Sequence, residues 1–419
     1  MLEFIVDILS EPSVLVGLVA LIGLLLQKKS LSDCISGTVK TIMGFLVLSG
    51  GASIVSGALG YFGQMFEHGF GITGIVPNNE AIVGMALNEI GSTTALIMAL
   101  GMIFNILIAR FTPLKYIFLT GHHTLYMACM FAAILHACGF TGLVSVIIGS
   151  IILGLVMALM PAMAQPFMKK ITGNDQVAFG HFGTFGYILS ALVGKAVGKG
   201  SKSTEEIKFP QSLTFLRDTS VAISITMLVL YLIVAIVAGP EFVGELSGDK
   251  NLVVFALLQA ITFAGGVYVI LAGVRLILGE IVPAFRGIAM KLVPNSKPAL
   301  DCPLVFPYAP NAVLIGFLCS FIGGVVGLFI LIALGAPAIL PGVVPHFFCG
   351  ATAGVFGNAT GGRRGAILGS FANGLLITFL PALLIPVLAG LGFGGATFSD
   401  ADFGVIGIIL AKILSIFGA

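Results

Sequence analysis

The sequence contains few charged residues. Lys, Arg, Asp and Glu together make up 9% of the 419 residues, whereas about a quarter is usual in a soluble globular protein. Hydrophobic residues make up 58%, and the mean hydropathy is +1.12. These values exclude a soluble globular chain and indicate an all-α polytopic protein of a lipid bilayer. The net charge of +2 does not indicate a nucleic-acid partner, because the basic residues lie in twos and threes near the ends of apolar runs, where they act as topology signals.

The sequence also lacks the patterns that mark metal sites and catalytic centres. Its six cysteines have no metal-ligand spacing, and we interpret them as reduced packing residues. They are Cys34, Cys129, Cys138, Cys302, Cys319 and Cys349. No serine–histidine–aspartate signature and no phosphate-cradling glycine loop is present. We therefore expect no catalytic residue, no metal and no cofactor in this chain.

A cleavable signal sequence is missing as well. No Lys or Arg precedes Lys28, so the basic region with which such a signal begins is absent. We interpret residues 1–12 as a short interfacial helix and expect the first apolar run to remain in the mature protein. Lys28 and Lys29 mark the cytoplasmic end of this run, which places the N-terminus outside.

Apolar runs fill most of the chain and predict about ten or eleven spans within one integral membrane domain, residues 1–419. The predicted spans are 13–27, 34–66, 92–109, 116–138, 141–163, 219–238, 252–282, 312–334, 366–388 and 404–417. Residues 199–217 are predicted to form a soluble loop, and their basic content places them in the cytoplasm.

Four stretches are too polar, or too rich in glycine and proline, for a regular spanning helix. Residues 70–91 form either an outer loop or a loop that dips into the membrane. Residues 171–200 are predicted to contain a re-entrant half-helix, and residues 337–362 a further broken segment. Residues 300–311 place Asp301 among three prolines, which break a helix. Such a backbone survives at membrane depth only when it is buried in protein or lines a polar cavity, so we expect the chain to fold around this segment.

A weak internal similarity connects residues 48–54 with residues 271–277. Both segments lie in unusually long, glycine-containing apolar runs. If the similarity is real, the two spans are members of an inverted repeat, because one runs outward and the other inward. Chance similarity between glycine-rich apolar helices explains the pattern at least as well.

Asp301, His122 and His181 are the strongest candidates for a ligand site. Each lies beside glycines or prolines, where exposed backbone and side chains can bind a hydroxylated ligand together. Tyr126 lies one helical turn after His122 and shares its face, although tyrosine is also common at membrane interfaces.

Other polar residues have simpler interpretations. Asn79 and Glu80 follow Pro77, and the local pattern favours a solvated outer turn. His136 and His346 are predicted to be structural or interfacial. The remaining polar candidates in apolar surroundings are Glu89, His123, Arg275, Glu280, Asn311 and Asn358.

Four runs of sequence resemble one family. They are GTVKTIMGF at residues 37–45, LTGH at 119–122, GH at 180–181, and LDC at 300–302 with YAPNAV at 308–313. In this order they resemble the ascorbate-type membrane subunit (IIC) of the bacterial sugar phosphotransferase system. The resemblance extends from the first span to the last broken segment.

The resemblance implies a homodimeric permease of the bacterial inner membrane, with a core domain that holds the sugar and a V-shaped domain that supports dimerisation. It also implies two partners, a phospho-cysteine subunit (IIB) that phosphorylates the sugar at the cytoplasmic face and a IIA subunit that charges it. His122, His181 and Asp301 match ligand-contacting positions of the family. Asn79 and Glu80, which follow the family-like FGITG at 70–74, fall at another such position.

The chain departs from the family pattern at two positions where the ascorbate proteins have glutamine. Tyr126 and Phe182 stand there instead. Ligand groups that would have bonded those amides need other partners, and such losses change specificity strongly.

The sequence thus predicts a permease subunit that binds L-ascorbate or a related small hydroxylated substrate and presents it inward for phosphorylation by IIB. An alternative is a proton- or ion-coupled secondary transporter, because the same histidines and aspartate could relay protons. A ligand sensor is a third class, but the sequence contains no soluble output domain for it.

Overall fold

A computed structural model describes residues 12–208, 215, 218–388 and 396–416. Within these ranges, seven helices are long and apolar enough to cross a membrane. The helices are α2 (Pro12–Leu26), α3 (Leu31–Phe70), α4 (Asn79–Phe111), α5 (Gly121–Ala137), α6 (Gly142–Thr172), α7 (Thr184–Val197), α8 (Thr219–Ala238), α9 (Pro240–Ser247), α10 (Leu252–Leu292), α11 (Pro310–Ala333), α12 (Val343–Pro345), α13 (Ala351–Leu388) and α14 (Ala401–Ile416). The chain is a mostly helical polytopic protein, as its composition predicts. The predicted interfacial helix falls almost wholly on residues 1–11, outside the described ranges.

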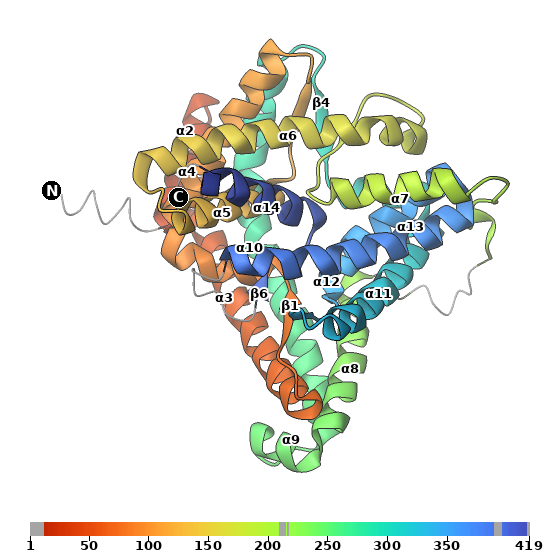
Figure 1. Ribbon diagram of the computed structural model, residues 1–419. Helices are drawn as coiled ribbons and strands as arrows, with labels where there is room; N and C mark the ends of the chain where they lie inside the picture. The colour runs from red at the N-terminus through yellow and green to blue at the C-terminus, as the bar shows by residue number, and fades with distance from the viewer. Residues whose placement is uncertain (1–11, 209–214, 216–217, 389–395, 417–419) are drawn as a thin grey trace.

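Three long helices form an arm that extends from the rest of the molecule. α3, α8 and α10 pack against one another, and α9 lies at their far end (Figure 1). The hydroxyl of Tyr231 in α8 donates to the carbonyl oxygen of Ala58 in α3 at 2.5 Å. We refer to α3, α8, α9 and α10 together as the arm.

Glycines let α3 and α10 approach closely within the arm. A Cβ added at Gly273 would lie 2.9 Å from the Cα of Leu48, and one added at Gly51 would lie 2.6 Å from the backbone nitrogen of Ile270. Small residues at such crossings are typical of membrane helices. The two similar segments, 48–54 and 271–277, therefore contact each other.

Two small parallel sheets gather the starts of several helices. Their strands are β1 (Gly74–Pro77), β2 (Tyr116–Phe118), β3 (Ala178–Phe179), β4 (Lys297–Leu300), β5 (Ala338–Ile339) and β6 (Ala396–Thr397). β1 lies between β5 and β6, and β4 lies between β2 and β3. The register pairs Val76 with Ala396 in the first sheet and Phe118 with Ala299 in the second. Each sheet thus joins segments that are far apart along the chain.

α13 is a helical hairpin and not one straight helix. Its backbone leaves the helical conformation at Gly361 and Gly362, and the φ of Gly362 is 56°, a conformation that favours glycine. The hydroxyl of Ser370, after the turn, donates to the carbonyl oxygen of Gly350, before it, at 3.3 Å. The two limbs of the hairpin correspond to the end of the predicted broken segment and the predicted span 366–388.

The predicted irregular segments are confirmed more fully than the predicted span boundaries. After β4 the chain forms two 3-10 turns, Cys302–Leu304 and Phe306–Tyr308, and α7 has only 14 residues. The span predicted at 116–138 is wrong at its start, because β2 occupies the first residues and α5 begins only at Gly121. The pairing of β2 with β4 that causes this is non-local.

The described part of the predicted soluble loop is anchored to the helices beside it. The carboxylate of Glu205 accepts the backbone N–H groups of Asn311 and Ala312 at 3.1 Å each. These are donors at the start of α11, where a helix leaves its N–H groups without intrahelical partners. Asn358 Oδ1 accepts the N–H of Thr204 at 2.9 Å, which joins the loop to α13.

Asp175 ties the end of α6 to β4. Its carboxylate lies 2.6 Å from Lys297 Nζ and 2.9 Å from Lys169 Nζ, and it accepts a hydrogen bond from Gln165 Nε2 at 2.7 Å. These partners, Lys297 first, hold the pKa of Asp175 well below its usual range.

We expect Asp175→Asn to lower the melting temperature slightly at pH 7, because the carboxylate is 43% exposed and such ion pairs are screened by solvent. A lowered folded-state pKa gives stability that is complete above the unfolded-state pKa, about 4, and is lost as the pH falls toward the folded-state value. Thermal scans at pH 7 and at successively lower pH should therefore show the difference shrinking below about pH 4. A difference that does not change with pH would contradict this assignment.

Candidate functional site

A cavity of about 570 Å³ lies where the starts of several helices meet α10. One side is formed by the first turns of α4 and α5, by residues that follow β3 and β4, and by residues that precede α14. The other side is formed by Leu271, Arg275, Gly279 and Pro283 of α10. The cavity therefore lies between the arm and the remaining helices.

All six predicted site residues line this cavity. They are Asn79, Glu80, His122, Tyr126, His181 and Asp301. The strands that precede them explain the convergence, because β1, β2, β3 and β4 each end just before one of these residues or its helix. Segments that carry polar residues after a strand are thereby brought to one place.

The solvated turn expected at Asn79 and Glu80 is wrong. The two residues are only 5% and 7% exposed and lie in the first turn of α4. Asn79 Oδ1 accepts the backbone N–H of Ser399 at 2.9 Å, and Asn78 caps the helix by accepting the N–H of Ala81 at 2.7 Å. The pairing of β1 with β6 draws this turn into the protein, and no local pattern reveals that pairing.

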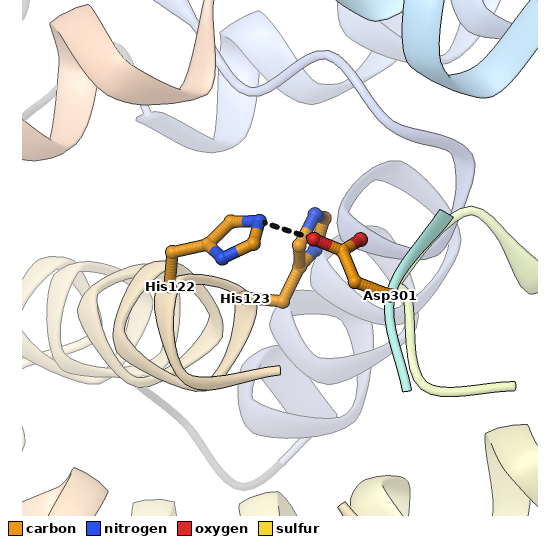
Figure 2. A group of neighbouring side chains, drawn as sticks. All are labelled: His122, His123 and Asp301. Atoms are coloured by element: carbon orange, nitrogen blue, oxygen red, sulfur yellow. Dashed lines mark ion pairs between the residues drawn. The ribbon is translucent and has the colours of Figure 1, made fainter. Parts of the chain in front are cut away.

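His122 and Asp301 face each other across the cavity wall. Figure 2 shows His122 and His123 projecting from the first turn of α5 toward Asp301 at the end of β4. His122 Nε2 lies 3.4 Å from Asp301 Oδ2. Asp301 Oδ1 accepts the N–H of Cys302 at 2.7 Å, which caps the turn that follows and fixes the carboxylate. The other oxygen remains to accept from His122 or from a ligand.

Asp400 is a cavity residue that the sequence analysis missed. It is buried between β6 and α14, and its Oδ2 lies 3.8 Å from His123 Nε2 and 3.9 Å from His181 Nε2. The hydroxyl of Ser399 donates to its other oxygen at 2.8 Å. The sequence signal was SDAD directly before the last apolar run, but such a pattern indicates a helix start and not a cavity.

His123, a polar candidate without an assigned role, has a defined hydrogen-bonding state. The backbone N–H of Phe182 donates to His123 Nδ1 at 3.3 Å, so in the neutral ring Nε2 carries the hydrogen. Histidine, carboxylate and cysteine atoms here lie within 4.8 Å of one another in three groups that could hold a metal ion. Two of these groups include His123, which has no free lone pair in this state. The arrangement favours hydrogen bonding to a ligand over metal coordination.

The two departures from the family pattern differ in position. Tyr126 lines the cavity, and its hydroxyl is buried without a hydrogen-bond partner among the described residues. Phe182 is buried elsewhere, stacked on Phe118 with ring centroids 4.7 Å apart and in contact with Phe403. Only Tyr126 can therefore meet a ligand directly.

Asp402 supports the site without lining it. Its buried carboxylate accepts the backbone N–H of Thr184 at 3.0 Å and that of Phe185 at 2.8 Å, at the start of α7. Its own N–H donates to the carbonyl oxygen of Phe182 at 3.0 Å. These bonds hold the segment that carries His181 against the start of α14.

The remaining candidates have structural surroundings where the structure describes them. His346 is buried, with Nδ1 at 2.9 Å from the hydroxyl of Ser320, which agrees with the predicted structural role. His136 is exposed at the end of α5. The side chain of Glu280 lies outside the described part of the structure.

Comparison with known proteins agrees with these features. Residues 7–402 match the family EIIC-GAT, described as the PTS system sugar-specific permease component. The chain is also similar to the ascorbate-specific PTS system EIIC component of Mycoplasma pneumoniae, with 28% identity over 378 residues. That alignment covers 79% of this chain and 56% of the relative, so the chain spans little more than half of the relative's length. A family match over nearly the whole chain shows that it belongs to the sugar-specific permease components of the phosphotransferase system, which are multi-pass proteins of the bacterial inner membrane.

Proposed function

We propose that this chain binds L-ascorbate or a related small hydroxylated substrate in the 570 Å³ cavity and presents it inward. The partners are a IIB subunit, which phosphorylates the substrate, and a IIA subunit, which charges IIB. The observation that carries this proposal is the convergence of all six predicted residues on one cavity. The chain supplies binding and movement, and the phosphoryl group comes from IIB.

The polar groups of the cavity suit hydroxyl groups. Asp301 Oδ2 accepts a hydrogen bond, His123 Nε2 donates one, and the Tyr126 hydroxyl can do either. A buried hydroxyl without a partner is costly, so a ligand or a water completes Tyr126. His122 and His181 donate or accept according to tautomer.

We further propose that the arm is the V-shaped domain, which supports a homodimer, and that the remaining long helices form the core that carries the substrate. The cavity supports this division, because one side comes from α10 and the other from helix starts outside the arm. Movement of one domain against the other would open the cavity alternately to each side.

An inverted repeat of about ten or eleven spans is part of this proposal. The strand order supports it. β1, β2 and β3 come from the first half of the chain and β4, β5 and β6 from the second. In each sheet the first strand of one half lies between the second and third strands of the other half. The contact of residues 48–54 with residues 271–277 lies between the corresponding helices α3 and α10.

A proton- or ion-coupled transporter remains a second candidate. His123, His181 and Asp400 form a buried cluster, and such clusters relay protons in membrane transporters.

Uptake into vesicles separates the two functions. We expect inverted membrane vesicles that carry this chain to convert a labelled substrate to its phosphate ester only when phosphorylated IIB is added, with no effect of a protonophore. Uptake that needs no IIB and stops when the proton gradient collapses would instead identify the secondary transporter. Vesicles without the chain provide the control.

A further inference from the structure

We propose that Glu80, Asp301 and Asp400 form a charge filter that accepts an uncharged polyhydroxylated substrate and excludes its anionic relatives, including its own phosphate ester. This inference rests on the proposed permease function and defines the substrate class of the same cavity. It narrows the choice between the ascorbate anion and neutral sugars or sugar alcohols in favour of the neutral compounds.

The balance of charged side chains in the cavity is acidic. Three carboxyl groups line it, and Arg275 is the sole Lys or Arg among the described lining residues. Asp301 and Asp400 have histidines, and no Lys or Arg, within 4.0 Å in the described ranges. Even with His122 protonated beside Asp301, the acidic groups outnumber the cations. An anion that enters must approach these carboxylates, and like charges brought together are strongly unfavourable.

Arg275 does not offset this balance at the ligand. It projects from α10 in the arm, whereas Glu80, Asp301 and Asp400 come from the opposite side of the cavity. Two of the carboxylates are held in place by other bonds, because Asp301 caps a turn and Asp400 accepts from Ser399. The acidic side of the cavity is therefore built in advance of binding.

An independent observation indicates that this acidic group faces a ligand. The hydroxyl of Tyr126 is buried, lines the same cavity and lacks a partner among the described residues. A sugar hydroxyl both donates and accepts, so one such group can accept from Tyr126 while another donates to Asp301 Oδ2. A carboxylate or a phosphate oxygen only accepts, so it cannot satisfy Asp301 or Asp400.

The same filter gives the reaction a direction. Phosphoryl transfer from IIB to a substrate hydroxyl forms an oxygen–phosphorus bond, breaks the bond to the IIB cysteine sulfur, and releases the hydroxyl proton. The product then carries about two negative charges. Because the carboxylates repel this product, it leaves the cavity and does not return to compete with fresh substrate.

Binding of matched neutral and anionic compounds tests the proposal. Isothermal titration of the purified full chain at neutral pH would compare ribitol with ribonate and ribitol 5-phosphate, galactitol with galactonate, and ascorbate as a further anion. We expect at least one neutral member to bind about 100-fold or more tightly than its anionic relatives. Equal or tighter binding of ascorbate or an aldonate, or no binding by any neutral member, would overturn the charge filter.

Two variants test the role of the carboxylates directly. Asp400→Asn keeps the shape of the side chain and should reduce the preference for the neutral member by about tenfold, and Asp301→Asn should act in the same direction. Glu245→Gln removes one negative charge from the exposed face of α9 and should leave the preference unchanged. An unchanged preference in both aspartate variants would also contradict the proposal. A separate assay of phosphate transfer from IIB distinguishes the two levels, because transfer to ascorbate would preserve the permease function while the charge filter fails.

Discussion

Replacing Asp301 by Asn is expected to abolish substrate uptake while the protein still folds and assembles. The amide oxygen of Asn can keep the hydrogen bond that Asp301 Oδ1 accepts from Cys302 at 2.7 Å, so the turn after β4 stays capped. The amide nitrogen then occupies the position of Oδ2, 3.4 Å from His122 Nε2, where it can only donate. A hydrogen bond to a charged acceptor is worth about 1.5–3 kcal/mol, so we expect a loss of about tenfold to 100-fold in affinity and a larger loss in transport.

IIB-dependent uptake in proteoliposomes measures this effect, and size-exclusion and thermal profiles measure assembly. Asp218→Asn is the matched control, because Asp218 also caps a helix, by accepting the N–H of Val221 at 3.0 Å, and does not line the cavity. Asn caps as well as Asp does, so this variant should transport normally. Normal uptake by the Asp301 variant would show that its carboxylate does not hold the substrate.

Gly354→Ala is expected to prevent normal folding. Gly354 lies where α13 crosses α11, and an added Cβ would meet the carbonyl oxygen of Ala312 and lie 2.8 Å from the Cα of Gly316. Both contacts are with backbone, which cannot rotate away as a side chain can. Overpacking usually costs about 1–3 kcal/mol, and we expect this site to reach or exceed the upper limit because two helices must separate.

The yield of monodisperse protein and its melting temperature after purification would show this loss. Gly50→Ala is the control, since Gly50 lies within α3 and nothing lies within 4 Å of an added Cβ there. Alanine favours a helix over glycine by about 1 kcal/mol, so the control should be at least as stable as the wild type. Equal yields of the two variants would mean that α11 and α13 can move apart without loss.

Helices with clear local borders were predictable from the sequence. The predicted span 219–238 coincides with α8 because Asp218 caps its start and Gly239 ends it. α10 was predicted to stop at residue 282, yet it continues through Pro283 to Leu292. Prolines are tolerated in membrane helices because neighbouring groups satisfy the freed carbonyl, so a proline there is a weak stop signal.

The site was predictable where the backbone is visibly broken. His181 follows a glycine and Asp301 precedes a proline, and both are local signals. Asp400 gave no such signal, because its place in the cavity depends on the pairing of β6 with β1, more than 300 residues apart in the register Val76 to Ala396. The grouping of the residues into one cavity depends on the same non-local pairing.

That pairing also sets the order in which the protein can be built in the membrane. β1 is synthesised early, but both of its neighbours, β5 and β6, lie between residues 338 and 397. Until the ribosome has delivered them, β1 has two open edges, and unpaired backbone is costly in lipid. Asn79 likewise cannot meet Ser399 before then. The nascent first half must therefore wait, sheltered by the insertion machinery or at the bilayer surface, and the substrate cavity is completed only as synthesis ends.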